Sequence, residues 1–268
     1  MHDIIIIGSG PAGLSAGITA RARGKDVLLV SNNRVDSGFY KAHHIDNYPG
    51  LPGVTGAQLS GHMFAHATGS GVKIVSGRVT SAAAQKGGFA VGFGAEAARG
   101  RALILAIGVV QSRLFPGEAE FLGRGVSYCA TCDGMFYRSR RVAVVELSPG
   151  AAAETEHLRK IGCDVTVVRT DRIEIHGASA VTHITAEGAG IPCDCVFILR
   201  ASVAPATLLP GLALDGAHIA VSRGMETSIP GVFACGDCAG APYQAAKAAG
   251  EGQIAALAAV KYIDEVRI

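Results

Sequence analysis

The first thirty residues place the tightest constraint on the fold of this chain. The apolar run Ile4-Ile5-Ile6-Ile7 leads into Gly8-Ser9-Gly10-Pro11-Ala12-Gly13, an Ala-rich segment continues to about Arg23, and Val27–Val30 is a second apolar run. Short β-branched runs of this kind predict buried parallel strands. The order of strand, glycine turn, helix and strand is the context in which a G-x-G-x-x-G motif holds a dinucleotide pyrophosphate at a helix N-terminus. The sequence therefore predicts a Rossmann-like unit.

The end of the second strand departs from this pattern. Rossmann units usually place an acidic residue there, which holds a ribose hydroxyl. This chain has Ser31-Asn32-Asn33 instead. Ser31 or Asn32 could hydrogen-bond a ribose, but without a charge.

The strand–helix–strand pattern restarts in the middle of the chain. Val142–Val145 and Val165–Val168 read as strands, and Ala151–Ile161 reads as the helix between them. This internal repeat predicts a second Rossmann-like unit.

The turn of the second unit is Glu146-Leu147-Ser148-Pro149-Gly150. Ser148 is a favourable N-cap and Pro149 a favourable first helical residue, so the helix is well specified. The glycines that admit a pyrophosphate are missing, and Glu146 would repel phosphates if it faces the helix N-terminus. Arg169 and Arg172, after the next strand, could meet a phosphate, although solvated surface charges describe them better.

A pair of thiols lies between the two units, in Cys129-Ala130-Thr131-Cys132-Asp133. A Cys-x-x-Cys pair can close into a disulfide, and a helix N-terminus favours the reactive thiolate. Asp133 could supply or take the proton during exchange. The alternatives are two core thiols, or half of a zinc site completed by Cys235 and Cys238. In a chain with a dinucleotide fold, redox chemistry is the better interpretation and no metal is expected.

A third strand near the end of the chain, Val232-Phe233-Ala234, leads to Asp237, and an Ala-rich helix runs from Gln244 to about Tyr262. An acid between a buried strand and a helix N-terminus is well placed to accept a hydrogen bond from a ribityl hydroxyl. We interpret the cysteines outside the dithiol motif as packing residues: Cys163, Cys193, Cys195, Cys235 and Cys238.

Composition excludes several classes of protein. The chain has 268 residues, 36 of them glycine, and is 49% hydrophobic and 17% charged, which is typical of an α/β protein with many tight turns. A net charge of +2 gives no footprint for nucleic acid. The apolar stretch near the C-terminus carries Lys247, Glu251 and Gln253, so a membrane span is not expected. Seven unevenly placed cysteines and no signal peptide favour the cytoplasm.

Four motifs in order resemble the low-molecular-weight thioredoxin reductases: Gly8 to Leu14, Asn47-Tyr48-Pro49-Gly50, Cys129 to Gly134, and Gly236-Asp237. The resemblance covers the whole chain. It implies an α/β fold of two Rossmann-like, FAD/NAD(P)-binding domains, the second inserted in the first and shortened. The FAD-binding domain would comprise residues 1–112 and 227–268. A degenerate NAD(P)-binding-like domain, 113–226, would carry the dithiol, and the protein would be a homodimer.

The resemblance also implies roles for individual residues. Cys132 would face the flavin, Cys129 would attack the partner's disulfide, and Asp133 would be the acid. The residues implied for FAD binding are Gly8, Ser9, Gly10, Pro11, Ala12, Gly13, Ser31, Asn32, Asn47, Val79, Ala106, Gly108, Gly236, Asp237, Gln244 and Ala245.

The departures from the family indicate the electron donor. Family members bind NADPH through a glycine-rich turn and a His-Arg-Arg cluster, where this chain has Glu146 to Gly150 and Arg169-Thr170-Asp171. The chain thus resembles the pyridine-nucleotide-independent members, which are ferredoxin-linked or carry a second flavin. We expect a disulfide oxidoreductase that uses FAD to reduce a thioredoxin-like protein, without NADPH. The alternatives are a dithiol oxidase that passes electrons to oxygen, and a non-catalytic flavoprotein redox sensor.

Overall fold

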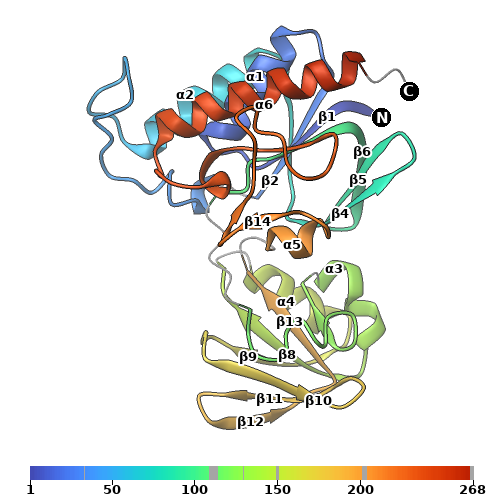
Figure 1. Ribbon diagram of the computed structural model, residues 1–268. Helices are drawn as coiled ribbons and strands as arrows, with labels where there is room; N and C mark the ends of the chain where they lie inside the picture. Colours follow the sequence, from blue (N-terminus) through green and yellow to red (C-terminus); the bar gives the residue numbers. More distant parts are fainter. Residues whose placement is uncertain (33, 109–113, 129, 149–150, 201–203, 266–268) are drawn as a thin grey trace. The chain divides into compact units, whose positions relative to one another are not determined.

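The computed structural model describes residues 1–268 except 33, 109–113, 129, 149–150, 201–203 and 266–268 (Figure 1). The chain divides into two compact units, which are described separately: unit 1 is Met1–Val110 with Ala204–Ile268, and unit 2 is Gln111–Val203. The sequence placed the second boundary at residue 227, whereas residues 204–226 lie in unit 1. The reason is packing: Met225 belongs to the unit 1 core, and its carbonyl accepts the Ala234 N–H at 3.0 Å.

Unit 1 is built on a seven-stranded sheet with the order β3-β2-β1-β6-β5-β4, in which β16 also pairs with β6. Its parallel strands are β1 (His2–Ile7), β2 (Val27–Ser31), β3 (Lys73–Ser76), β6 (Glu96–Leu105) and β16 (Val232–Ala234). The antiparallel strands are β4 (Val79–Gln85) and β5 (Gly88–Phe93). The carboxyl ends of β1, β6 and β16 therefore meet at one edge, as ligand binding by a Rossmann sheet requires.

Three long helices accompany this sheet: α1 (Pro11–Ala22), α2 (Gly56–Gly69) and α6 (Ala245–Glu265). They share a buried core with β1 and β6 that includes Ile4, Ile6 and Ile104. Helix α2 begins with a capping box, in which Thr55 Oγ1 accepts the Gln58 N–H at 3.2 Å.

Helix α6 lies against the start of α1 without an intervening side chain. A Cβ atom on Gly252 would lie 2.0 Å from the carbonyl oxygen of Ala12, so only glycine fits this contact. Because α6 is so close, its first turns reach the segment that follows β1. The short elements of unit 1 are η1 (Arg34–Asp36), α5 (Pro205–Leu208), β14 (Leu214–Asp215), β15 (His218–Ile219) and η3 (Gly236–Ala239).

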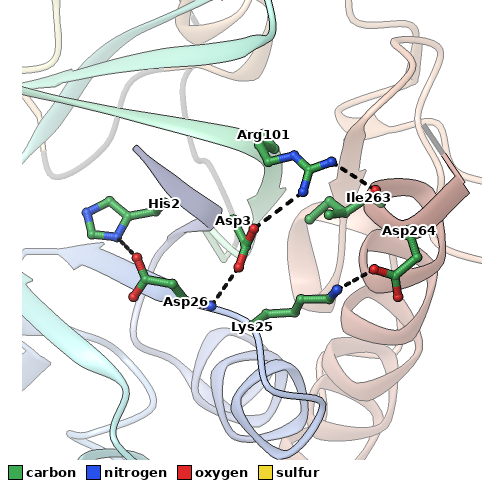
Figure 2. A network of polar contacts seen from close by, with 7 residues as sticks. All are labelled: His2, Asp3, Lys25, Asp26, Arg101, Ile263 and Asp264. Atoms are coloured by element: carbon green, nitrogen blue, oxygen red, sulfur yellow. Dashed lines mark hydrogen bonds and ion pairs between the residues drawn. The ribbon is translucent and has the colours of Figure 1, made fainter. Parts of the chain in front are cut away.

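A polar network holds the other end of α6, at the amino end of β1. Figure 2 shows its members: His2, Asp3, Lys25, Asp26, Arg101, Ile263 and Asp264. Arg101 bridges β1 and α6, because its guanidinium lies 3.6 Å from Asp3 Oδ1 and donates to the Ile263 carbonyl at 2.9 Å. Lys25 pairs with Asp264. Helix α6 is thus fixed at both ends, with its N-terminal turns left at the carboxyl edge of the sheet.

Unit 2 contains the predicted second Rossmann-like pattern. Its parallel sheet has the order β7-β13-β8-β9, formed by β7 (Val126–Ser127), β13 (Cys195–Leu199), β8 (Arg141–Glu146) and β9 (Asp164–Val168). The helical segments are α3 (Ala130–Asp133), η2 (Gly134–Tyr137) and α4 (Ala151–Lys160). A small antiparallel sheet adds β10 (Ile173–Gly177), β11 (Val181–Ala186) and β12 (Ala189–Pro192).

A buried ion pair closes unit 2. Glu118 is 0% exposed and pairs with Arg200, which lies over the ring of Phe115. Tyr128 donates to the same carboxylate at 2.9 Å, and burial, followed by the charge of Glu118, raises the Tyr128 pKa. These contacts join the first and last described parts of unit 2, so it is closed where its chain enters and leaves.

None of the helices in the described part of the chain combines the length and apolar character that a membrane crossing needs.

Two glycines of α6 test the α1–α6 contact. Gly252→Ala should lower the free energy of unfolding by about 2 kcal/mol or more, because the new methyl group meets the Ala12 backbone. Gly250→Ala is the matched control: Gly250 is exposed, a Cβ added there would meet nothing within 4 Å, and the variant should gain roughly 0.5–1 kcal/mol of stability. Urea titrations measure both, and equal effects would contradict the packing.

Candidate functional site

The site in unit 1 begins where the backbone after β1 touches the backbone after β6. Gly8 has φ +111°, and a Cβ there would lie 2.1 Å from the Ala106 carbonyl oxygen. Gly8 N–H donates to Val30 at 2.8 Å, and Ala106 N–H donates to Ile7 at 2.8 Å. Gly8 is therefore required by the fold of the protein itself.

The other two glycines of the motif differ in what surrounds them. A Cβ on Gly13 would lie 1.9 Å from the Gly8 oxygen, whereas a Cβ on Gly10 would have nothing within 4 Å. Gly10 is the N-cap of α1 in extended backbone, and Pro11 is the first helical residue. The protein leaves open the side of Gly10 beside the helix N-terminus, where a pyrophosphate would bind. The glycine turn thus fits the pyrophosphate of a dinucleotide.

The end of β2 is tied to this turn. Ser31 Oγ lies 2.8 Å from Ser9 Oγ and accepts the Ser9 N–H at 3.2 Å. Asn32 is exposed. Of the two side chains that the sequence offered to a ribose, Ser31 is already engaged by the turn.

The turn η3 brings Asp237 close to the glycine turn and the start of α1. Gly236 has φ +80°, and a Cβ there would lie 2.9 Å from the Cβ of Ala12. Asp237 is half-buried, and this burial raises its pKa while the charge of Lys247 lowers it. Asp237, the acid predicted from the sequence, therefore lies in a turn that packs on the start of α1.

The remaining predicted flavin contacts come from separate segments of unit 1. Asn47 Nδ2 donates to Gln244 Oε1 at 2.6 Å, and Ala245 is the first residue of α6. Val79 begins β4, which is separated from β1 by β5 and β6 in the sheet. Gly108 has φ +71° and open space at its Cβ position. The structure joins Asn47 to Gln244, and Val79 comes two residues after Gly77, whose N–H donates to the Ser31 carbonyl at 2.8 Å.

The dithiol is described only in part. Cys129 lies outside the described residues, and Cys132 is described by its backbone, in α3. Asp133 Oδ2 accepts a hydrogen bond from Ser127 at 2.7 Å, and Glu154 Oε2 accepts the Ala130 N–H at 3.3 Å. Sequence reasoning missed Ser127 and Glu154, because neither belongs to the motif and Glu154 comes from α4.

Two apolar side chains beside the motif were also missed. Met135 is 60% exposed and Phe136 is 80% exposed, in η2 directly after Asp133 and Gly134. Gly134 is buried against Leu158, so the turn itself is packed while the next two side chains face solvent. Large apolar residues directly after a reactive motif are the signal that could have identified them.

In unit 2, the last residue of β8, which begins the turn, is held by a hydrogen bond and an ion pair within the protein. Glu146 has a side chain only 8% exposed, accepts from Thr155 at 2.6 Å, and pairs with Arg169 at 2.8 Å. Arg172 pairs with Glu187 at 2.7 Å. The sequence predicts both arginines as solvated surface charges. Both are exposed, as expected, but each is also paired with a glutamate.

The hydroxyl of Ser148 donates to the Leu199 carbonyl at 3.1 Å. Pro149 and Gly150 lie outside the described residues.

The five described cysteines are free and buried. Burial raises the pKa of each, to about 11 for Cys193 and Cys238. Cys238 Sγ lies 3.4 Å from the Leu105 carbonyl. Among the described residues, no three histidine, cysteine, aspartate or glutamate side chains gather as a metal site would require, and Cys129 lies outside those residues.

Comparison with known proteins identifies the family. The profile of the Pyridine nucleotide-disulphide oxidoreductase family matches residues 2–180 and 170–252. A thioredoxin reductase of Listeria monocytogenes is 30% identical over 304 residues, which cover 100% of this chain and 95% of the relative. One from Treponema pallidum is 30% identical over 302 residues, covering 99% and 98%.

Solved structures agree with this result. A ferredoxin-flavin thioredoxin reductase from Clostridium acetobutylicum superposes with a TM-score of 0.93 at 39% identity, covering 99% of this chain and 98% of the other. A thioredoxin reductase from Gloeobacter violaceus gives a TM-score of 0.83 at 31% identity, covering 100% and 95%.

The chain therefore belongs to the pyridine nucleotide-disulphide oxidoreductase family, in its thioredoxin reductase branch. It is a flavin-dependent disulfide oxidoreductase, and the family cofactor is FAD, which the open glycine turn fits. The predicted family, fold class and enzyme class are confirmed. The matches support neither the oxygen-linked oxidase nor the non-catalytic sensor.

Cysteine labelling tests whether Cys235 and Cys238 form a second redox pair. With a pKa of about 11, Cys238 is ionised to about one part in a thousand at pH 8, and burial raises the pKa of Cys235 as well, so iodoacetamide should leave both unmodified. The reduced native protein is labelled and its peptides are weighed by mass spectrometry. Labelling in urea, which should modify all seven cysteines, is the control. Native labelling of Cys235 or Cys238 as fast as Cys129 would contradict the packing role.

Proposed function

We propose that this chain transfers electrons from a donor other than NADPH, through FAD and the Cys129–Cys132 pair, to a disulfide of a thioredoxin-like protein. The single observation that carries the proposal is the Glu146–Arg169 pair in the turn of unit 2. FAD supplies the redox step between the donor and the dithiol. The steps assigned to the protein are to hold the flavin, to exchange disulfides and to exclude a nicotinamide cofactor.

The flavin is held by the segments that meet at the carboxyl edge of the unit 1 sheet. Gly8 to Gly13 and the N-terminus of α1 receive the pyrophosphate. Asp237 accepts from the ribityl chain, and Gln244, oriented by Asn47, contacts the flavin end. The other proposed contacts are Ser31, Asn32, Val79, Ala106, Gly108, Gly236 and Ala245.

Disulfide exchange is assigned to the motif in unit 2. The Cys129 thiolate attacks one sulfur of the partner's disulfide, and the other sulfur leaves as a thiolate that takes a proton from Asp133. The Cys132 thiolate then attacks Cys129, which releases the second sulfur of the partner and closes the Cys129–Cys132 disulfide. Ser127 orients Asp133 by donating to its carboxylate. Two electrons delivered at Cys132 reopen the disulfide to two thiolates, and a proton from solvent returns Asp133 to its acid form.

The partner disulfide is assigned to a protein because of the surface beside the motif. Met135 and Phe136 present exposed apolar side chains directly after the residues that react. An exposed apolar pair suits a protein surface better than a small thiol, because burying it contributes to binding. The relatives named thioredoxin reductases support a thioredoxin-like partner.

The donor is assigned by electrostatics in unit 2. A pyrophosphate at the start of α4 would approach the buried carboxylate of Glu146, and two unit charges about 4 Å apart repel by roughly 1–4 kcal/mol. Arg169, the cation best placed to offset this repulsion, is already paired with Glu146. The similarity to a ferredoxin-flavin thioredoxin reductase supports ferredoxin as the donor. A second flavin is the alternative arrangement.

Two further properties are inferred from the resemblance. The protein is a symmetric homodimer, which light scattering tests. It acts in a reducing cytoplasm, which suits the free state of the five cysteines that the structure describes.

Anaerobic titration of the holoenzyme tests the donor. Reduced ferredoxin should bleach the flavin band stoichiometrically, and excess NADPH should not. Glu146→Ser removes the repulsion and frees Arg169, so it should raise residual NADPH affinity about tenfold. Glu187→Gln frees Arg172 without changing the turn, and should have no effect.

The flavin content of the same samples separates one FAD per chain from two. Rapid stoichiometric bleaching of the wild-type protein by NADPH would contradict the proposal.

A further inference from the structure

Two oppositely charged side chains of α6 lie beneath the turn that carries Asp237. Lys247 and Glu251 are one helical turn apart, and Lys247 Nζ lies 3.0 Å from Glu251 Oε2. Their side chains are only 18% and 19% exposed. A lysine and a glutamate this far from solvent lose hydration, so each needs a full set of partners.

The turn η3 supplies those partners. Glu251 Oε2 accepts the Gly236 N–H at 2.9 Å. Lys247 Nζ donates to the carbonyl oxygens of Gly236, at 3.1 Å, and of Gly240, at 2.5 Å. With Glu251, these make three acceptors for the three N–H groups of the ammonium. The pair therefore fixes both ends of the turn on either side of Asp237.

The backbone conformation of this turn depends on glycine at both of its ends. Gly236 and Gly240 have φ values of +80° and +123°, which other residues rarely adopt. Gly236 and Gly252 both lie against Ala12, where a Cβ would come within 2.9 Å and 2.0 Å of it. Helix α6 thus sets the spacing between the glycine turn and Asp237.

The two charges act on Asp237 in opposite directions. Burial is the main cause that raises the Asp237 pKa, Lys247 lowers it and Glu251 raises it. Three other titratable groups come from the elements around the turn. They are the neutral thiols of Cys235 and Cys238, and His218 on β15, whose ring bonds the Tyr243 hydroxyl at 2.7 Å.

We propose that Lys247 and Glu251 are positioning residues for FAD, which hold the η3 turn and so set the position and charge environment of Asp237 beside the ribityl chain. The inference rests on the proposed role of Asp237 in the function above. Their position on α6 couples this contact to the pyrophosphate turn, because the same two helical turns touch Ala12.

FAD release from the holoenzyme measures the effect of the pair. Lys247→Met keeps the length of the side chain but removes three hydrogen bonds and a charge, so the dissociation constant of FAD should rise about 10- to 100-fold. Flavin fluorescence on dilution reports release. Lys261→Met is the matched control on the same helix, because Lys261 and Glu265 have the same spacing but are 73% and 65% exposed, 3.8 Å apart. It should bind FAD as the wild type does.

The pH profile of FAD release distinguishes positioning and charge from general damage. Protonating Asp237 removes the acceptor, so release should increase as pH falls. Without Lys247 the Asp237 pKa is higher, and the midpoint should move to higher pH in Lys247→Met. In Glu251→Gln it should move to lower pH. A His218→Gln variant should keep the wild-type midpoint, which separates imidazole titration from that of Asp237.

Asp237→Asn separates the failure of this inference from that of the proposed site. If Asp237→Asn binds FAD like the wild type, the proposed flavin contact is wrong. If Asp237→Asn loses FAD while Lys247→Met and Glu251→Gln behave like Lys261→Met, the positioning role is wrong. If Lys247→Met does not fold, the midpoint shift of Glu251→Gln decides: a shift to lower pH supports the inference, and an unchanged midpoint overturns it.

Discussion

Direct backbone contact around the glycine turn is the constraint on which the rest of unit 1 depends. Gly8 and Gly13 allow the turn, the end of β6 and the start of α1 to touch, and Gly252 brings α6 onto Ala12. A side chain at any of these positions would separate the segments by more than a tightly packed core tolerates. Because the turn and α6 are in contact, segments more than 200 residues apart in the sequence meet at the proposed flavin site.

Unit 2 has the same strand–helix–strand topology, but the residues of its turn make different contacts. Its strands and α4 keep a Rossmann-like arrangement, but Glu146 pairs with Arg169 and accepts from Thr155. The charges that could serve a nicotinamide cofactor are satisfied within the protein. The unit retains a scaffold for α3 and the dithiol, and the buried Glu118–Arg200 pair closes it. In the proposed function, fold and cofactor preference are separable, since one buried carboxylate changes the chemistry of the turn.

Periodicity and turn residues predicted most of the elements, including the strand–helix–strand order of both units and the acid after β16. The second domain boundary was misplaced because a local pattern does not show which core a segment joins, and Val221 and Met225 before β16 pack in the core of unit 1. The partners of Ser31, Asp133 and Glu146 could not be predicted. Such contacts join positions that only the folded chain brings together, and no sequence pattern indicates which way each side chain points. In the sequence alone, Lys247 and Glu251 indicated only that this helix is too polar to cross a bilayer.

The central claim is that the Cys129–Cys132 pair and the flavin form one electron-transfer unit. An anaerobic dithionite titration of the holoenzyme, followed at the flavin band, tests it most directly by counting electrons. The wild-type protein should take up about four electrons per chain, two for the flavin and two for the disulfide, and Cys129→Ser about two. An uptake of about two electrons by both proteins, with FAD bound and the thiols of the wild type oxidised at the start, would contradict the account.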